Sequence, residues 1–298
     1  MQLKTLIGLF LLCLFLGCRT DRDRDQKKTG FREFSAETPS HPTVGGDSIY
    51  YRFPSGREML NYLHSRDFVY LSGLANPAEE AVRYQSARSR TLNLGVYLAD
   101  MSYMILFDKP RRGEAFLDAV VQLTNKLRID LPDRQKMIER VSRNLHNTDS
   151  LVQISEDYQS QVIDYLLETG QEKTLAVIST GSYIEGLYLA LHMTGDYEEH
   201  RETVQRIAEQ KYAVGHLKRF CENYRSDAHA RFALDYLKQL YAFYQQLPVH
   251  EEKTRVRRKG SNRMVFDGGD RISMPPDRFE EFKALVFGMR NEIVKAKQ

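Results

Sequence analysis

Cysteine is scarce in this chain, with three in 298 residues. Cys13 lies within the apolar N-terminal segment and Cys18 directly after it, so Cys221 is the only thiol in the remainder of the sequence. One thiol cannot form an intramolecular disulfide. The fold must therefore rest on its hydrophobic core, and we interpret Cys221 as a small buried apolar residue.

The chain also lacks the short motifs of common catalytic and phosphate-binding sites. It has no His-Glu-x-x-His, no paired Cys-x-x-Cys, no Gly-x-Ser-x-Gly and no glycine-rich phosphate loop. Catalytic residues stay unknown, and we expect no cofactor and no metal ion. These absences argue against an enzyme without excluding one, because distant residues can assemble a site that leaves no motif.

Charge of one sign is equally scarce. The 43 lysines and arginines against 40 aspartates and glutamates leave a formal net charge of +3. This balance does not indicate a polyanionic partner, so we expect no nucleic-acid binding. A hydrophobic content of 42% is typical of a globular protein.

The N-terminal apolar segment is too short to cross a membrane. It runs from Leu6 to Leu16 after the single positive charge of Lys4, whereas a spanning helix needs about 20 apolar residues. Gly17 and Cys18 follow, and a small residue before a cysteine is the pattern of a lipoprotein cleavage site. We therefore expect residues 1–17 to be a signal peptide and Cys18 to carry the lipid, with palmitate among its acyl chains. An ordinary secretory signal with an incidental cysteine is the alternative.

Residues 18–46 resemble a tether. They contain a run of alternating charges, then Pro39, Pro42 and Gly45-Gly46, and such a composition cannot bury enough apolar surface to order itself. Residues 47–298 are then one folded domain, joined to the membrane through Cys18. The expected location is the cell envelope, at the outer membrane, with the periplasmic or surface face undecided.

From Pro54 onward the apolar spacing is helical. We predict an all-α fold, a single multi-helix bundle, with Gly170 and Gly195 ending two of its helices. The predicted helices cover about 55–64, 77–107, 113–129, 132–146, 149–169, 171–194, 197–224, 227–247 and 275–295. The helix at 171–194 is the most apolar; Glu185 and His192 within it favour a central bundle helix over a transmembrane one.

The region near 263–274 breaks the helical pattern. Arg-Met-Val-Phe at 263–266 and Arg-Ile-Ser-Met at 271–274 flank Asp267-Gly268-Gly269-Asp270. We predict a small C-terminal β-hairpin before the last helix, with its turn at the two glycines.

Two acids lie in the two most apolar helices, Asp100 in one and Glu185 in the other. A buried carboxylate is costly unless it is paired or hydrogen-bonded, so each must have a partner. One interpretation is a polar pocket between the helices; the other is a purely structural role. The candidate pocket residues are Asn93, Tyr97, Asp100, Tyr103, Ser182, Glu185 and His192. Glycines inside these helices, Gly95, Gly181 and Gly186, indicate close helix approach or a gap for a ligand.

A basic cluster precedes the predicted hairpin. Its members are Lys253, Arg255, Arg257, Arg258, Lys259 and Arg263. Such a cluster can meet anionic lipid or lipopolysaccharide phosphates, although a solvated charged strand or loop is the simpler interpretation.

Three stretches of predicted core helix resemble those of a known protein family. They run from Thr91 to Tyr103, Phe116 to Leu127 and Gly181 to Ala190, and Arg290-Asn-Glu-Ile-Val follows near the end. With the lipoprotein signal ahead of them, they resemble an uncharacterised family of helical lipoproteins from Bacteroidota, over about residues 85–298. The resemblance implies an all-helical, lipid-anchored domain and no particular activity.

The sequence thus predicts a lipid-anchored envelope protein of unknown molecular activity, acting as a binding or structural component. Its partner is another envelope protein or a small ligand near Asp100 and Glu185. The alternatives are an enzyme that uses this acid pair, and a membrane-surface lipid binder acting through residues 253–263.

Overall fold

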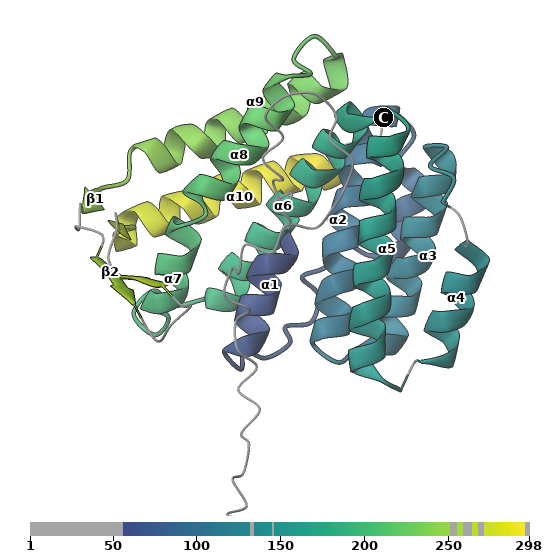
Figure 1. Ribbon diagram of the computed structural model, residues 1–298, viewed down its shortest axis with the longest axis horizontal. Helices are drawn as coiled ribbons and strands as arrows, with labels where there is room; N and C mark the ends of the chain where they lie inside the picture. The colour runs from purple at the N-terminus through teal and green to yellow at the C-terminus, as the bar shows by residue number, and fades with distance from the viewer. Residues whose placement is uncertain are drawn as a thin grey trace, which may run out of the picture. The chain divides into compact units, whose positions relative to one another are not determined.

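The computed structural model describes residues 56–131, 134–144, 146–250, 255–258, 264–267 and 271–295. These residues form ten α-helices, one 3₁₀ helix and two short antiparallel strand pairs, which confirms the all-α bundle with a small hairpin before the last helix (Figure 1). Residues 1–55, which include the predicted signal peptide, Cys18 and the tether, lie outside the described residues. Asp47–Gln298 is a compact unit with one continuous hydrophobic core.

The helices make up most of the described chain. In chain order they are α1 (Gly56–Ser65), the 3₁₀ helix Ala78–Arg83, α2 (Ala87–Leu106), α3 (Pro110–Lys126), α4 (Arg134–Arg143), α5 (Thr148–Glu168), α6 (Glu172–Thr194), α7 (Arg201–Ala208), α8 (Lys211–Glu222), α9 (Ala228–Gln245) and α10 (Pro276–Lys295). The strands are β1 (Val249–His250), β2 (Arg255–Arg258), β3 (Met264–Asp267) and β4 (Arg271–Ile272).

Local capping sets several of these boundaries. The side chains of Ser86, Asn147 and Asp227 each accept a hydrogen bond from a backbone N–H in the first turn of α2, α5 and α9. Gly170 and Gly195 lie beyond the ends of α5 and α6 with φ of +67° and +57°, where glycine is favoured. Both predicted helix ends are confirmed.

Two predicted helices prove to be divided. The segment 77–107 is a 3₁₀ helix and then α2, because Tyr84 is extended and its hydroxyl donates to the carbonyl of Val294 at 3.1 Å. The segment 197–224 is α7 and α8, with the break at Glu209 and Gln210. Apolar periodicity continues across such breaks, so periodicity alone does not reveal them.

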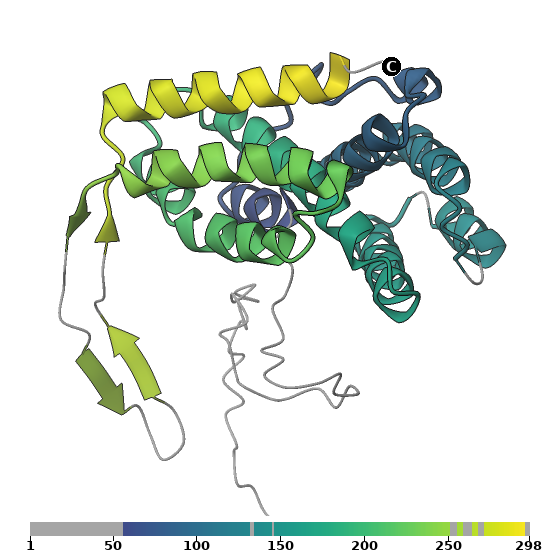
Figure 2. The ribbon, with the colours of Figure 1, turned by 90° about the horizontal axis from the view of Figure 1, so that it is seen from above.

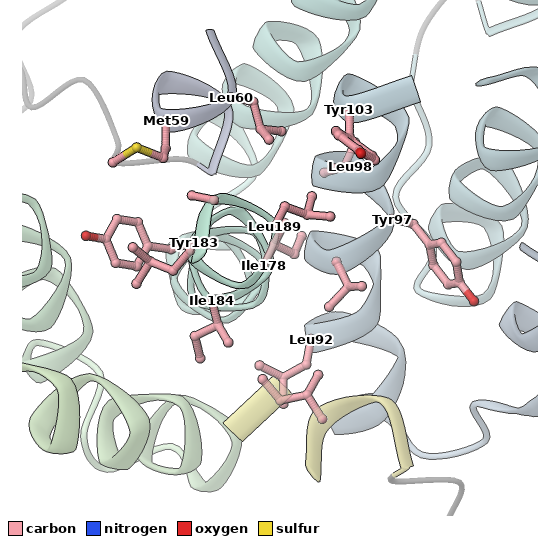
Figure 3. Close-up of a cluster of buried hydrophobic side chains, with 14 of the residues drawn as sticks. Met59, Leu60, Leu92, Tyr97, Leu98, Tyr103, Ile178, Tyr183, Ile184 and Leu189 are labelled. Carbon is pink, nitrogen blue, oxygen red and sulfur yellow. The ribbon is translucent and has the colours of Figure 1, made fainter. Parts of the chain in front are cut away.

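Helix α6 is the centre of the bundle. It contacts α1, α2, α5, α7, α8, α9 and α10. Figure 3 looks along α6, which lies beside α1 and α2, and shows its apolar side chains pointing outward in several directions. Among the described helices it alone is long and apolar enough to span a membrane by length and composition, but 89% of that apolar window is buried within the protein. It is therefore a core helix of the bundle.

Two glycines let α2 and α6 approach closely. A Cβ atom added at Gly95 would overlap the carbonyl oxygen of Ile178, and one added at Gly181 would overlap that of Leu92. Between the two predicted roles of these glycines, the structure therefore supports close helix contact, since neither position leaves space for a ligand.

The hairpin exists, but its predicted strand pairing is wrong. The strands predicted on either side of Gly268 and Gly269 do not pair with each other: β3 pairs with β2, and β4 pairs with β1. The strand pairs extend away from the ends of α9 and α10 (Figure 2). Val256 lies opposite Phe266 and Arg255 opposite Asp267. The described part of the basic cluster, Arg255–Arg258, is thus itself a strand of the hairpin. The sequence did not indicate this pairing, because the two glycines are the stronger local turn signal.

Candidate functional site

The two buried acids meet, and an arginine joins them. Asp100 on α2 and Glu185 on α6 are both fully buried. Arg290 on α10 donates from Nε to Glu185 Oε2 at 3.0 Å and from Nη2 to Glu185 Oε1 at 3.2 Å. This bidentate geometry is the strongest arrangement for an arginine and a carboxylate. Nη2 also donates to the carbonyl oxygen of Leu74 at 3.2 Å.

Asp100 lies beside the ion pair of Glu185 and Arg290. Its Oδ2 accepts a hydrogen bond from the backbone N–H of Asn76 at 3.1 Å, whereas its Oδ1 is buried and has no hydrogen-bond partner among the described residues. Two neighbouring carboxylates in a buried site repel each other, so one of them keeps its proton. Since Glu185 faces the guanidinium of Arg290, Asp100 is the group that stays neutral.

Burial and charge both support this assignment. Desolvation raises the pKa of Asp100 well above its usual value, and the neighbouring Glu185 charge raises it further. Desolvation also raises the pKa of Glu185, but Arg290 opposes that shift by charge and hydrogen bonding. Burial alone would lower the pKa of Arg290, but Glu185 outweighs it and the net shift is upward. The cluster is therefore a neutral acid beside an ion pair.

The predicted tyrosines hold the segment before α2 against that helix. The Tyr103 hydroxyl accepts from the Leu71 N–H at 2.8 Å and donates to the Leu71 carbonyl at 2.9 Å. The Tyr97 hydroxyl donates to the carbonyl of Pro77 at 2.9 Å and accepts from Asn76 Nδ2 at 2.9 Å. Burial raises the pKa of Tyr103 to about 12, so both hydroxyls act as neutral hydrogen-bonding groups.

The remaining predicted residues of α2 and α6 contact the last helix. Asn93 Nδ2 donates to the carbonyl of Ile293 at 3.1 Å. His192 stacks on Phe287 with ring centroids 4.2 Å apart, and burial lowers its pKa, helped by the positive charges of Lys283 and Arg290. Together with Arg290, these contacts fasten α10 to α2 and α6, so the cluster closes the bundle and leaves the acids out of solvent.

The most enclosed sizeable hollow lies elsewhere on α6. It is a cleft of about 370 Å³ between α1, α5 and α6, with Leu98 of α2 also lining it. Of the predicted pocket residues only Ser182 lines it. The side chains that border it are Arg57, Glu58, Asn61, Leu98, Gln153, Glu156, Asp157, Gln159, Ser160, Val162, Ile163, Leu175, Ile178, Ser179 and Ser182.

Each of the three helices supplies a regular face to this cleft. On α6 the lining residues are Leu175, Ile178, Ser179 and Ser182, which lie three, four and seven positions apart on one side of the helix. The α5 face is mostly polar because its apolar side packs on other helices. The result is a polar rim over an aliphatic floor, within the size range of about 300–1,000 Å³ common for ligand sites.

Most of the charges at the cleft are paired. Arg57 Nη2 lies 2.7 Å from Glu156 Oε1, and Asp157 Oδ2 lies 2.8 Å from Arg140 Nη2. Hydrogen bonds from Gln153 and Arg140 lower the pKa of Asp157. The carboxylate of Glu58 has no ion-pair partner among the described residues.

The other hollows are poorer sites. One between α3, α4 and α5 is apolar but has only about 20 Å³ of space, about enough for one water molecule. Two larger ones, of about 480 and 440 Å³, are bordered by six and eight mainly polar residues and lack an aliphatic floor. The cleft on α6 is therefore the best-formed candidate site within the described part of the chain.

The remaining sequence features have limited potential as sites. In the described residues no group of three or more His, Cys, Asp or Glu side chains could hold a metal ion. Cys221 is fully buried as predicted, and its pKa is raised to about 11 by that burial. Of the basic cluster, Arg255, Arg257 and Arg258 lie in β2, while Lys253, Lys259 and Arg263 lie outside the described residues.

Two parts of this arrangement were not foreseen from the sequence. In the sequence Arg290 stands out only within the stretch that carries the resemblance, although a buried acid pair requires a cationic partner. The cleft depends on α1 and α5, whose residues carry no distinctive motif. The available signal was the pair Ser179 and Ser182, two hydroxyl-bearing residues three positions apart on one side of the most apolar helix.

Comparison with known proteins adds no family to this description. No protein-family profile matches the chain, and neither a curated protein nor a solved structure is significantly similar to it.

Proposed function

We propose that this chain is a lipid-anchored protein of the bacterial cell envelope whose helical domain binds a small molecule in the cleft between α1, α5 and α6. The lipid on Cys18 is its attachment to the outer membrane, and the resemblance to helical lipoproteins of Bacteroidota supports the same location. The cleft takes the place of the acid pair as the proposed ligand site, because Asp100 and Glu185 are fully buried.

One observation carries the binding proposal. Ser179 and Ser182 border the cleft with only 7% and 8% of their surfaces exposed, yet neither hydroxyl has a hydrogen-bond partner among the described residues. Thr180 and Thr194 of the same helix instead donate to the carbonyls of Ala176 and Ala190. A hydroxyl that borders the cleft without a partner in the protein can accept and donate hydrogen bonds there, so both are available to a polar ligand.

Blocking the cleft tests the binding proposal. Ser160 lies on the rim and is exposed, so Ser160→Trp fills the cleft without disturbing the core. The soluble chain Arg19–Gln298 is screened by thermal shift against small polar metabolites, with Ser142→Trp on the exposed side of α4 as the matched control. We expect compounds that raise the melting temperature of the wild type and the control but not of Ser160→Trp. Equal stabilisation of Ser160→Trp, or no stabilising compound, would argue against the cleft.

Anchoring is tested separately. The full chain is expressed in a bacterium fed with labelled palmitate, alongside a Cys18→Ala variant. Label on the wild type alone supports lipidation at Cys18. Mature protein that begins at another residue and carries no label would identify an ordinary secretory signal.

A further inference from the structure

The unpaired charge of the cleft indicates which ligands it can accept. Three carboxylates and one guanidinium border it. Arg57 is paired with Glu156, and Asp157 with Arg140, which leaves Glu58. An anionic ligand would be repelled by this residual charge, whereas a cation would be attracted, and the walls of a cleft strengthen that preference by focusing the field.

The lining also indicates the shape of the ligand. The floor consists of aliphatic side chains, namely Leu98, Val162, Ile163, Leu175 and Ile178, and no aromatic side chain is among the residues that border the cleft. Flat rings are commonly held by stacking on aromatic side chains. The floor instead suits a chain of methylene groups, whose transfer from water contributes roughly 0.8 kcal/mol per buried CH₂.

The hydrogen-bonding groups match one cation in particular. A primary ammonium group has three N–H donors and no acceptor. The carboxylate of Glu58 and the hydroxyl oxygens of Ser179 and Ser182 are three acceptors without a partner in the described part of the chain, and all three border the same cleft. The two hydroxyls come from α6 and the carboxylate from α1, which packs directly against α6.

We propose that the ligand of this cleft is an aliphatic molecule carrying a primary ammonium group, with Glu58 as its counter-charge and Ser179 and Ser182 as its hydrogen-bond partners. This inference rests on the proposed function, because it names the ligand class of the same cleft.

Three probes with the same five-carbon chain separate the chemical classes: 1,5-diaminopentane, 1,5-pentanediol and glutarate. Their binding to Arg19–Gln298 is measured by saturation-transfer NMR titration, which detects weak ligands. We expect the diamine to bind, the diol to bind at least tenfold more weakly and glutarate not to bind. Ser160→Trp should abolish binding of the diamine.

Substitutions then test each proposed contact. Glu58→Gln keeps the shape but removes the charge, and it should weaken diamine binding roughly tenfold or more. Glu79→Gln is the matched control, because Glu79 is also an exposed glutamate in the first turn of a helix, away from the cleft. Ser179→Ala with Ser182→Ala should weaken binding several-fold without lowering stability, since neither hydroxyl bonds within the described protein.

The outcomes distinguish the two proposals. If the diol or glutarate binds as tightly as the diamine, and Ser160→Trp abolishes that binding too, the ammonium assignment is overturned while the cleft remains a ligand site. Diamine binding that survives Glu58→Gln unchanged overturns it as well. Binding of any probe that persists in Ser160→Trp contradicts the cleft itself, and with it the proposed function.

Discussion

Arg290 of the last helix donates two hydrogen bonds, of 3.0 and 3.2 Å, to Glu185 of the central helix, 105 positions away in the sequence. Both side chains are buried, so water cannot take the place of either partner in the ion pair. The ion pair therefore fastens α10 to α6, and Asp100 of α2 lies beside it, close enough for both charges to shift its pKa.

The two acids of the cluster should respond very differently to amide substitution. Glu185→Gln leaves the buried Arg290 without its counter-charge and should cost about 3–5 kcal/mol of unfolding free energy. Asp100→Asn replaces a neutral carboxyl group by a neutral carboxamide, and both can donate and accept hydrogen bonds. This variant should therefore lose less than about 1.5 kcal/mol. Urea unfolding followed by circular dichroism measures both. Equal losses would show that Asp100 is ionised in the folded protein.

The pH dependence of stability should also distinguish Asp100. Its pKa in the folded protein is raised above the usual 3.8, chiefly by burial. A raised pKa means that the folded state holds its proton where the unfolded state has lost it, so stability falls as pH rises from about 4 towards the folded pKa. Asp100→Asn has no proton to lose, and its stability relative to wild type should increase with pH over that window. Parallel stability curves for the two proteins would refute the assignment.

The glycine contact between α2 and α6 should tolerate no side chain. Gly95→Ala and Gly181→Ala each place a methyl group on a backbone carbonyl of the other helix, and overpacking of this kind costs about 1–3 kcal/mol or more. Gly288→Ala is the matched control: it lies within α10 with nothing within 4 Å of an added Cβ. That variant should gain up to about 1 kcal/mol from helix propensity. Thermal unfolding of the three variants would show whether the contact is as close as described.

Cys221 should be inert in the folded protein. Its thiol lies 3.8 Å from the Thr180 hydroxyl and from the Ala176 carbonyl, and burial raises its pKa to about 11. Only the thiolate reacts readily. Arg19–Gln298 contains no other cysteine, so an aromatic disulfide reagent should release colour only after urea is added. Rapid reaction in native buffer would mean that α6 and α8 open locally.

The basic hairpin arm provides a test of the lipid-binding alternative. Arg255, Arg257 and Arg258 lie together in β2, and each basic residue at an anionic surface contributes about 1 kcal/mol. Replacing all three by Gln should abolish sedimentation of Arg19–Gln298 with phosphatidylglycerol vesicles, if this arm meets the membrane. The control variant replaces three other exposed basic residues, Lys126, Arg143 and Arg231, by Gln. It removes the same amount of charge elsewhere on the protein and should leave sedimentation with the vesicles unchanged. Equal effects of the two triple variants would reduce the interaction to net charge.

Much of the fold could be predicted because its causes are local. Helix periodicity, the caps at Asn147 and Asp227 and the stops at Gly170 and Gly195 each depend on a few neighbouring residues, so the sequence determined the all-α class and most helix ends. The predicted lipid attachment at Cys18 is local in the same way. The sequence also determined that Asp100 and Glu185, within apolar helices, required partners.

Which partners they found was decided only by the tertiary structure. Arg290 reaches Glu185 because α10 packs on α6, and no local pattern encodes a contact across 105 positions. The hairpin pairing was misjudged for the same reason, since the glycines are a local signal while the register of β2 and β3 depends on both arms. The cleft, too, exists only where α1, α5 and α6 meet. Its acceptors come from separate helices, and only packing brings them to one place.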